Sequence, residues 1–311
     1  MLKKLSLFTL LLMLVIPVQA EEIPYLLTVA AKGEIATLRA MLDAGTNPNT
    51  KDKDGITALM YAARKDQVEA VSALLAKGAD PNAVDQGGWS ALMFAARKNH
   101  VAVARVLLEN GADPMLRDQS GWSALGMAAT SGYFEFVSLL LQHGVDPNAK
   151  SDDGRSVLMH AAKSGDVPTI RVLMEKGADA FTRDRYGSTA LMYAAREGHV
   201  DTAAALLEQG ANIEASDQQK WTALTWAVKK KQAEMAKLLL SKGANPNHKD
   251  SEGTPVLQVA VLNTDAEMIK LLLDAGAKVK ARDQYGLTAY VYALKTGKPE
   301  IVKLIKDAGG S

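Results

Sequence analysis

Short apolar blocks alternate with glycine- and aspartate-rich turns along the chain, and this pattern predicts pairs of helices. Residues 185–217, RYGSTALMYAAREGHVDTAAALLEQGANIEASD, show one unit of the pattern. The hydroxyl of Thr189 is placed to cap a first helix over about 190–196. A second amphipathic helix is expected over about 200–208, and Gly210 ends it in the left-handed conformation that glycine tolerates best. Such a two-helix unit cannot bury its apolar face alone, so it must stack on its neighbours.

The unit recurs at a fixed interval of 33 residues. One glycine series marks the end of each second helix, and another marks the turn before each first helix. The second series is interrupted only by Lys220, and no insertion or deletion falls between Gly45 and Gly309. The two series are Gly45, Gly78, Gly111, Gly144, Gly177, Gly210, Gly243, Gly276 and Gly309, and Gly55, Gly88, Gly121, Gly154, Gly187, Gly253 and Gly286.

These repeated residues resemble a known family. The period of 33, the G-x-[TS]-x-L opening, the paired alanines, and closings such as GADPN at 78–82 and GANPN at 243–247 are similar to ankyrin repeats over about residues 23–311. The resemblance implies an all-α repeat solenoid of about nine repeats including caps. Stacked helix-turn-helix units would be joined by β-hairpin-like loops and would form a concave face.

A signal peptide is expected before the repeats. The first twenty residues include Lys3 and Lys4, an apolar run over 5–16, and small residues ahead of a cleavage site after Ala20. A retained membrane anchor is the weaker alternative, because the run is shorter than the ~20 residues that cross a bilayer as a helix. The predicted divisions are a signal peptide at 1–20 and an ankyrin-repeat domain at 21–311, with an N-cap at 21–52, repeats at 53–85, 86–118, 119–151, 152–184, 185–217, 218–250 and 251–283, and a C-cap at 284–311.

The start of the first helix departs from the family pattern. That pattern carries Thr-Pro-Leu-His, whereas this chain mostly has Thr/Ser-Ala-Leu-Met, and the histidine is absent from every unit. We expect Met60, Met93, Met159 and Met192 to fill the space, because methionine adapts to irregular gaps. Pro255 stands where one repeat should have its capping hydroxyl.

Charge and cysteine content narrow the function classes. The chain has 36 basic and 35 acidic residues, and removal of Lys3 and Lys4 with the signal leaves 34 against 35, a net charge of −1. This balance gives no general attraction to nucleic acid or to an anionic membrane, so we expect neither nucleic-acid binding nor membrane insertion. The chain has no cysteine, which excludes disulfides and thiol catalysis.

Residues that could carry chemistry follow the repeat instead of converging on one site. No nucleophile motif or phosphate-binding loop is present, and no two histidines have metal-ligand spacing on one helix turn. His100 and His199 occupy equivalent repeat positions, which favours a structural role. A methionine ladder suggests copper(I), but equivalent positions about 8–10 Å apart cannot share an ion.

Aspartates also recur at one position, three residues before the turn glycine. Acid–base catalysis needs carboxylates in different environments, whereas a ladder of equivalent groups favours hydrogen bonding within the hairpins. We therefore predict neither enzymatic activity nor a cofactor. The ladder consists of Asp52, Asp85, Asp118, Asp184, Asp217, Asp250 and Asp283.

Partner-binding residues are expected at exposed positions where the repeats differ. Counted from the turn glycine, position +1 holds three of the four tryptophans, position +9 is basic in six of eight units, and position +6 holds several aromatic residues. Tryptophan and arginine are the usual anchors of protein interfaces, although cations at +9 also suit a helix end and +6 can belong to the core. The predicted partner-binding residues are Trp89, Trp122, Trp221 and Arg155 at +1, Arg64, Arg97, Lys163, Arg196 and Lys229 at +9, and Tyr61, Phe94, Tyr193 and Trp226 at +6.

The sequence thus predicts a monomeric, non-enzymatic protein–protein interaction scaffold in the periplasm or outside the cell. It would bind a partner protein with an acidic surface through its concave face. The family resemblance implies two roles for an exported bacterial member, support of a periplasmic enzyme or toxin immunity, and the sequence does not choose between them. The alternative is a structural cell-envelope protein without a single tight partner.

Export is directly testable. Protein recovered from the periplasm or the medium should begin at Glu21, because cleavage is expected after Ala20. Intact mass spectrometry measures the N-terminus. A membrane-bound product that keeps Lys3 and Lys4 would contradict the prediction.

Overall fold

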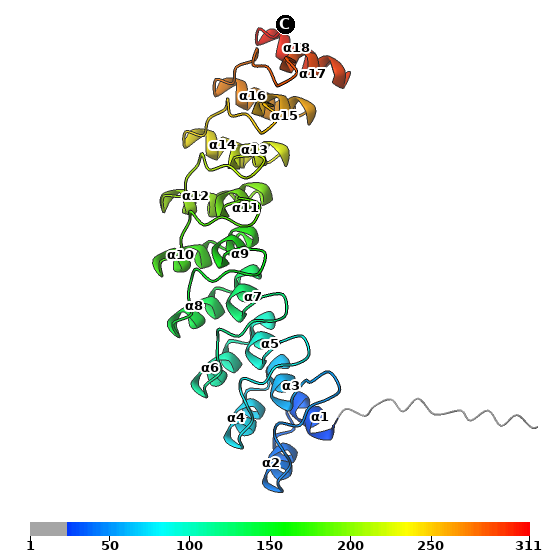
Figure 1. Ribbon diagram of the computed structural model, residues 1–311, viewed down its shortest axis with the longest axis vertical. Coiled ribbons are helices and arrows are strands. Elements are labelled where there is room, and N and C mark those ends of the chain that lie inside the picture. Colours follow the sequence, from blue (N-terminus) through cyan, green and yellow to red (C-terminus); the bar gives the residue numbers. More distant parts are fainter. Residues whose placement is uncertain (1–23) are drawn as a thin grey trace, which may run out of the picture.

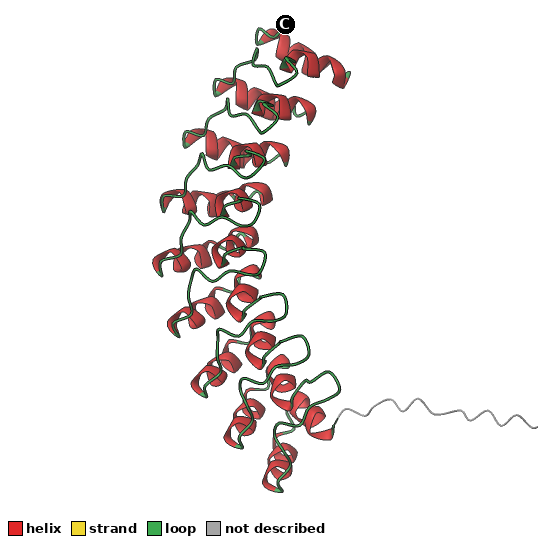
Figure 2. Cartoon of the chain, viewed as in Figure 1, coloured by secondary structure: helices red, strands yellow, loops and turns green. Residues whose placement is uncertain are grey.

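The computed structural model describes residues 24–311, which form eighteen helices arranged as successive pairs (Figure 1). The pairs stack along a curved axis, and loops join each pair to the next (Figure 2). Extended pairing in this part of the chain is limited to isolated bridges in the hairpins. The predicted all-α repeat solenoid is confirmed. The predicted signal peptide at 1–20 lies outside the described residues.

The first helix of each pair lies on the concave side of the stack and the second on the convex side (Figure 1). The inner helices are α1 (Tyr25–Lys32), α3 (Ala58–Arg64), α5 (Ala91–Lys98), α7 (Ala124–Thr130), α9 (Val157–Ser164), α11 (Ala190–Glu197), α13 (Ala223–Lys229), α15 (Val256–Leu262) and α17 (Ala289–Thr296). The outer helices are α2 (Ile35–Asp43), α4 (Val68–Ala76), α6 (Val101–Glu109), α8 (Phe134–Gln142), α10 (Val167–Glu175), α12 (Val200–Glu208), α14 (Ala233–Ser241), α16 (Ala266–Asp274) and α18 (Pro299–Asp307).

Hydroxyl caps start most inner helices. The Oγ1 of Thr189 accepts a hydrogen bond from the backbone N–H of Met192 at 3.4 Å, which fixes the start of α11 where the sequence predicted it. A cap of this kind stabilises a helix by about 1 kcal/mol. Pro255 starts α15 without a side-chain cap, as its missing hydroxyl predicted. Gly210, with φ of 86°, follows the end of α12 in the left-handed conformation, which also agrees with the prediction.

An aspartate holds the hairpin in front of most inner helices. The Oδ1 of Asp184 accepts hydrogen bonds from the N–H groups of Tyr186 and Ser188, both at 2.9 Å. All seven aspartates of the ladder make the equivalent pair of bonds, so the predicted hairpin role is confirmed. Ser151 occupies this position in the remaining unit.

The core runs continuously between the inner and outer helices. Met60, Met93, Met159 and Met192 are at most 2% exposed, which confirms that methionine fills the space expected for the family's histidine. Fully buried alanines beside them allow the inner helices to pack closely. None of the helices in residues 24–311 has the length and apolar character of a membrane span.

Polar side chains join consecutive units at the edges of this core. The Nε2–H of His100 donates to the carbonyl of Arg64 at 3.2 Å, which confirms its structural role. The side-chain amide of Asn82 donates to the carbonyl of Gly111 at 3.0 Å, while its Oδ1 accepts from the N–H of Asp113. The same bonds recur at His199, and at Asn49, Asn148 and Asn247.

Because each unit contacts only its neighbours, the position of a cavity decides how far its effect spreads. Leu206 and Ile305 are both fully buried, in α12 and in α18. We expect Leu206→Ala to lower the free energy of unfolding by roughly 2–5 kcal/mol for the whole array. Ile305→Ala should instead loosen α17 and α18 alone. Urea unfolding with hydrogen exchange measures both, and equal shifts of the entire transition would contradict this local coupling.

Candidate functional site

Side chains at three repeat positions meet on the concave side. The hairpin residue at +1 folds back over the inner helix, which carries the residues at +6 and +9. In one repeat the rings of Trp89 and Phe94 lie 5.2 Å apart, and in another those of Trp221 and Trp226 lie 4.7 Å apart. In these two repeats, the predicted residues at +1 and +6 are therefore brought together, whereas Trp122 and Arg155 contact the +6 residue of the next repeat.

Basic side chains at +9 lie over these rings. The guanidinium carbon of Arg64 is 4.7 Å from the ring centroid of Tyr61 and 5.8 Å from that of Phe94 in the next repeat. Arg196 bridges Tyr193 and Trp226 in the same way, at 4.9 and 5.6 Å. Cation–π contacts of this kind contribute about 0.5–1 kcal/mol each at exposed sites. The arginines therefore join neighbouring repeats.

From the sequence we predicted exposed tryptophan anchors, but in the structure these side chains are only partly exposed. Trp89 and Trp122 are half-buried against the core, because the hairpin lays each indole on the inner helices. Tyr193 is only 4% exposed and belongs to the core. Lys163 and Lys229 are exposed, and within residues 24–311 neither stacks on an aromatic ring. Their role in binding stays a prediction.

Arg155 differs from the tryptophans that share its repeat position. Its Nε donates to the hydroxyl of Tyr193 at 2.8 Å, and its guanidinium forms an ion pair with Asp153 at 3.0 Å. The Tyr193 hydroxyl in turn donates to Asp184 Oδ2 at 2.7 Å. Burial, followed by this bond to Asp184, raises the pKa of Tyr193 to about 12. The guanidinium of Arg155 is therefore already engaged in a hydrogen bond and an ion pair within the protein.

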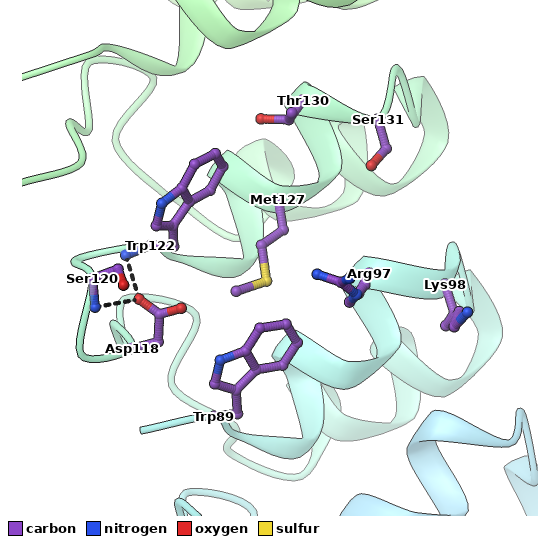
Figure 3. Close-up of a pocket in the computed structure, with 9 residues that line it drawn as sticks. All are labelled: Trp89, Arg97, Lys98, Asp118, Ser120, Trp122, Met127, Thr130 and Ser131. Carbon is purple, nitrogen blue, oxygen red and sulfur yellow. Dashed lines mark hydrogen bonds between the residues drawn. The ribbon is translucent and has the colours of Figure 1, made fainter. Parts of the chain in front are cut away.

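Two adjacent clefts open on either side of Trp89. The cleft between Trp89 and Trp122 has a volume of about 540 Å³, with Met127 between the two indoles (Figure 3). The cleft between Ile56 and Trp89 has a volume of about 550 Å³ and reaches Arg64. We call them the Trp89–Trp122 cleft and the Ile56–Trp89 cleft. They share the indole of Trp89, so they form one continuous surface.

The shared rim of the clefts is basic. Arg97 and Lys98 line both of them, and the guanidinium carbon of Arg97 lies 5.5 Å from the Trp89 ring centroid. In residues 24–311, no carboxylate forms an ion pair with Arg64, Arg97 or Lys98. Their charge is therefore available to a ligand. The same part of the chain holds no group of three or more acidic or histidine side chains that could bind a metal.

Several residues of the clefts were not predicted from the sequence. Lys98 follows the basic +9 position, and Met127 and Thr130 occupy +6 and +9 in a repeat that lacks the usual aromatic and basic residues. Met127 and Thr130 could have been recognised because they depart from the aromatic series at +6 and the basic series at +9. Asp118 was recognised only as a hairpin residue, although it also lines the Trp89–Trp122 cleft.

His160 is a buried titratable group beside this surface. It is 4% exposed, its ring lies 4.6 Å from that of Trp122, and its Nε2 has no hydrogen-bond partner in residues 24–311. Burial lowers the pKa of His160 to about 4, against the opposing charge of Asp153. The neutral imidazole is therefore part of the folded state at neutral pH.

This burial predicts a loss of stability in acid. A histidine whose pKa is lower in the folded state stabilises the fold above about pH 6.5, and that stability is lost as the pH falls toward 4. The loss should reach about 3 kcal/mol. In urea unfolding at several pH values, His160→Met should flatten the decline, whereas the exposed His143→Gln should keep it. An unchanged acid profile for His160→Met would contradict the assignment.

Comparison with known proteins supports the architecture. The family model for ankyrin repeats (three copies) matches residues 26–118, 111–184, 158–250 and 243–310. No curated protein matches the chain in sequence. Because the matched segments together cover nearly all of the described residues and follow the observed helix pairs, the chain belongs to the ankyrin-repeat family.

Proposed function

We propose that the protein is a non-enzymatic scaffold that binds a partner protein through its concave face. Ankyrin repeats generally mediate protein–protein interaction. The observation that carries the proposal is the continuous surface around Trp89, where two clefts meet beneath basic side chains that have no ion pair in residues 24–311. Half-buried indoles and arginines are the residue types that anchor protein interfaces.

The same surface favours a partner with acidic groups. Arg64, Arg97 and Lys98 lie on adjacent inner helices, α3 and α5, so their charges add along one stretch of the concave face. Complementary charge raises the rate of association and selects among partners. The arginines already rest on aromatic rings, so little side-chain freedom is lost on binding. This preorganisation supports tight binding without a large conformational change.

We further propose that the protein works as a monomer after export, in the periplasm or outside the cell. The basis for export is the leader-like pattern of residues 1–20. Support of a periplasmic enzyme and toxin immunity both require a preformed surface for another protein. Either role is compatible with the surface around Trp89.

The proposal predicts that the indoles anchor the partner. Replacing both Trp89 and Trp122 with alanine should weaken capture of the native partner about 30-fold or more, because anchor truncations commonly cost 2 kcal/mol or more. Charge reversal at Arg64 and Arg97 should mainly slow association and reduce its salt dependence. Affinity capture from the envelope fraction, followed by binding kinetics with the captured protein, measures both effects.

Controls separate binding from folding. The half-buried indoles also contribute to packing, so each variant needs circular dichroism and an unfolding curve. Phe134→Ala provides a matched control, since Phe134 is exposed at the start of the outer helix α8 on the convex side. Undiminished capture by a folded double-tryptophan variant would remove this surface as the binding site.

A further inference from the structure

The second oxygen of the hairpin aspartate follows a pattern of its own. In four hairpins it accepts a hydrogen bond from the aromatic side chain nine residues later, at position +6 on the inner helix that follows the hairpin. Three of these donors are tyrosine hydroxyls and one is an indole N–H, at distances of 2.6–2.9 Å. The aspartate thereby ties the hairpin to the inner helix. The pairs are Asp52 with Tyr61, Asp184 with Tyr193, Asp217 with Trp226, and Asp283 with Tyr292.

The hairpins that carry Trp89 and Trp122 lack this donor. Asp85 faces Phe94 and Asp118 faces Met127 at the +6 position, and neither side chain can donate to a carboxylate. The Oδ1 atoms of both aspartates hold their hairpins as usual. Within residues 24–311, nothing donates a hydrogen bond to Asp118 Oδ2. Figure 3 shows this oxygen directed away from the hairpin and toward Met127.

The missing donor coincides with open space. The Trp89–Trp122 cleft, of about 540 Å³, lies where Met127 replaces the tyrosine found in other repeats. Its two sides are indoles, and Asp118 is on its wall (Figure 3). The cleft can therefore hold an aromatic side chain together with some of the backbone that bears it. Asp118 thus offers the same carboxylate acceptor as the aspartates of other hairpins, and indoles surround it. The aromatic donor at +6 is missing, because Met127 occupies that position.

We propose that the partner supplies the ring, by inserting a tyrosine from an acidic segment into the Trp89–Trp122 cleft, against Met127. Its hydroxyl donates to Asp118 Oδ2, as the chain's own tyrosines do in other repeats. Acidic residues that flank the tyrosine pair with Arg97 and Lys98 on the rim. This inference rests on the proposed function, because it names the group recognised by the same surface.

Other side chains fit these surroundings less well. A lysine or arginine could donate to Asp118, but Arg97 and Lys98 line the same cleft and repel a cation. Serine and threonine carry the hydroxyl but not the area to fill the space between two indoles. Phenylalanine fills the space but leaves the carboxylate without a donor. Tyrosine meets both requirements, and three of the four intact repeats use it.

The test uses two synthetic peptides and the full mature chain. Each peptide is capped at both ends and carries a single aromatic residue between glutamates, either tyrosine or phenylalanine. We expect the tyrosine peptide to bind about 10-fold more tightly or better, because a hydrogen bond to a charged acceptor is lost with phenylalanine. Tryptophan fluorescence and calorimetry measure the affinities. Equal affinities would overturn the inference.

Met127→Tyr provides the decisive variant. The new tyrosine should occupy the cleft and bond to Asp118, as Tyr193 bonds to Asp184, so the chain stays folded while affinity for the tyrosine peptide falls at least about 10-fold. Val259→Tyr is the matched control, since Val259 occupies the same repeat position beside Asp250 and lies outside the cleft. It should leave peptide binding unchanged.

Capture of the native partner distinguishes failure of the tyrosine inference from failure of the proposed function. If Met127→Tyr captures the partner as well as the wild type does, while the double-tryptophan variant loses it, the tyrosine inference fails and the proposed function stands. If both variants capture the partner normally, the proposed binding surface fails as well. Loss of capture in both folded variants, with normal capture by Val259→Tyr, supports the tyrosine.

Discussion

Each helix pair depends on the next pair to cover its apolar side, and this constraint fixes the rest of the molecule. Fully buried alanines such as Ala62 and Ala95 let adjacent inner helices approach closely. Because the interval is always 33 residues, side chains at equivalent repeat positions lie next to one another along the stack. Polar groups and rings are therefore aligned in columns, and the columns at +1, +6 and +9 lie on the concave side.

These columns contribute to stability and to binding through the same side chains. Arg64 rests on Phe94 of the next repeat, and Arg196 rests on Trp226 of the next repeat, so each arginine connects two units. The contact also holds the guanidinium in place before any partner arrives. Because these contacts between repeats hold the arginine side chains in one conformation, less side-chain entropy is lost on binding.

Much of this architecture could be predicted from the sequence, because local rules and the repeat agree. The cap at Thr189, the helix over 200–208 and the aspartate turns each follow from residue chemistry within a few positions. The clefts could not be predicted in this way. The volume of each cleft depends on how the hairpin lays Trp89 on the core. The volume of the Trp89–Trp122 cleft depends also on Met127, which stands where several other repeats carry an aromatic ring.

A departure from the repeat does not by itself create a binding site. In the hairpin after the clefts, Ser151 replaces the aspartate and Arg155 stands where the two preceding hairpins carry tryptophan. Arg155 nevertheless reaches Tyr193 and Asp153, so its polar groups are satisfied internally. At Asp118, no side chain in residues 24–311 donates a hydrogen bond to the second carboxylate oxygen, and this residue lines the open Trp89–Trp122 cleft. Whether a substitution is compensated within the stack therefore decides where a repeat protein keeps a group available for a partner.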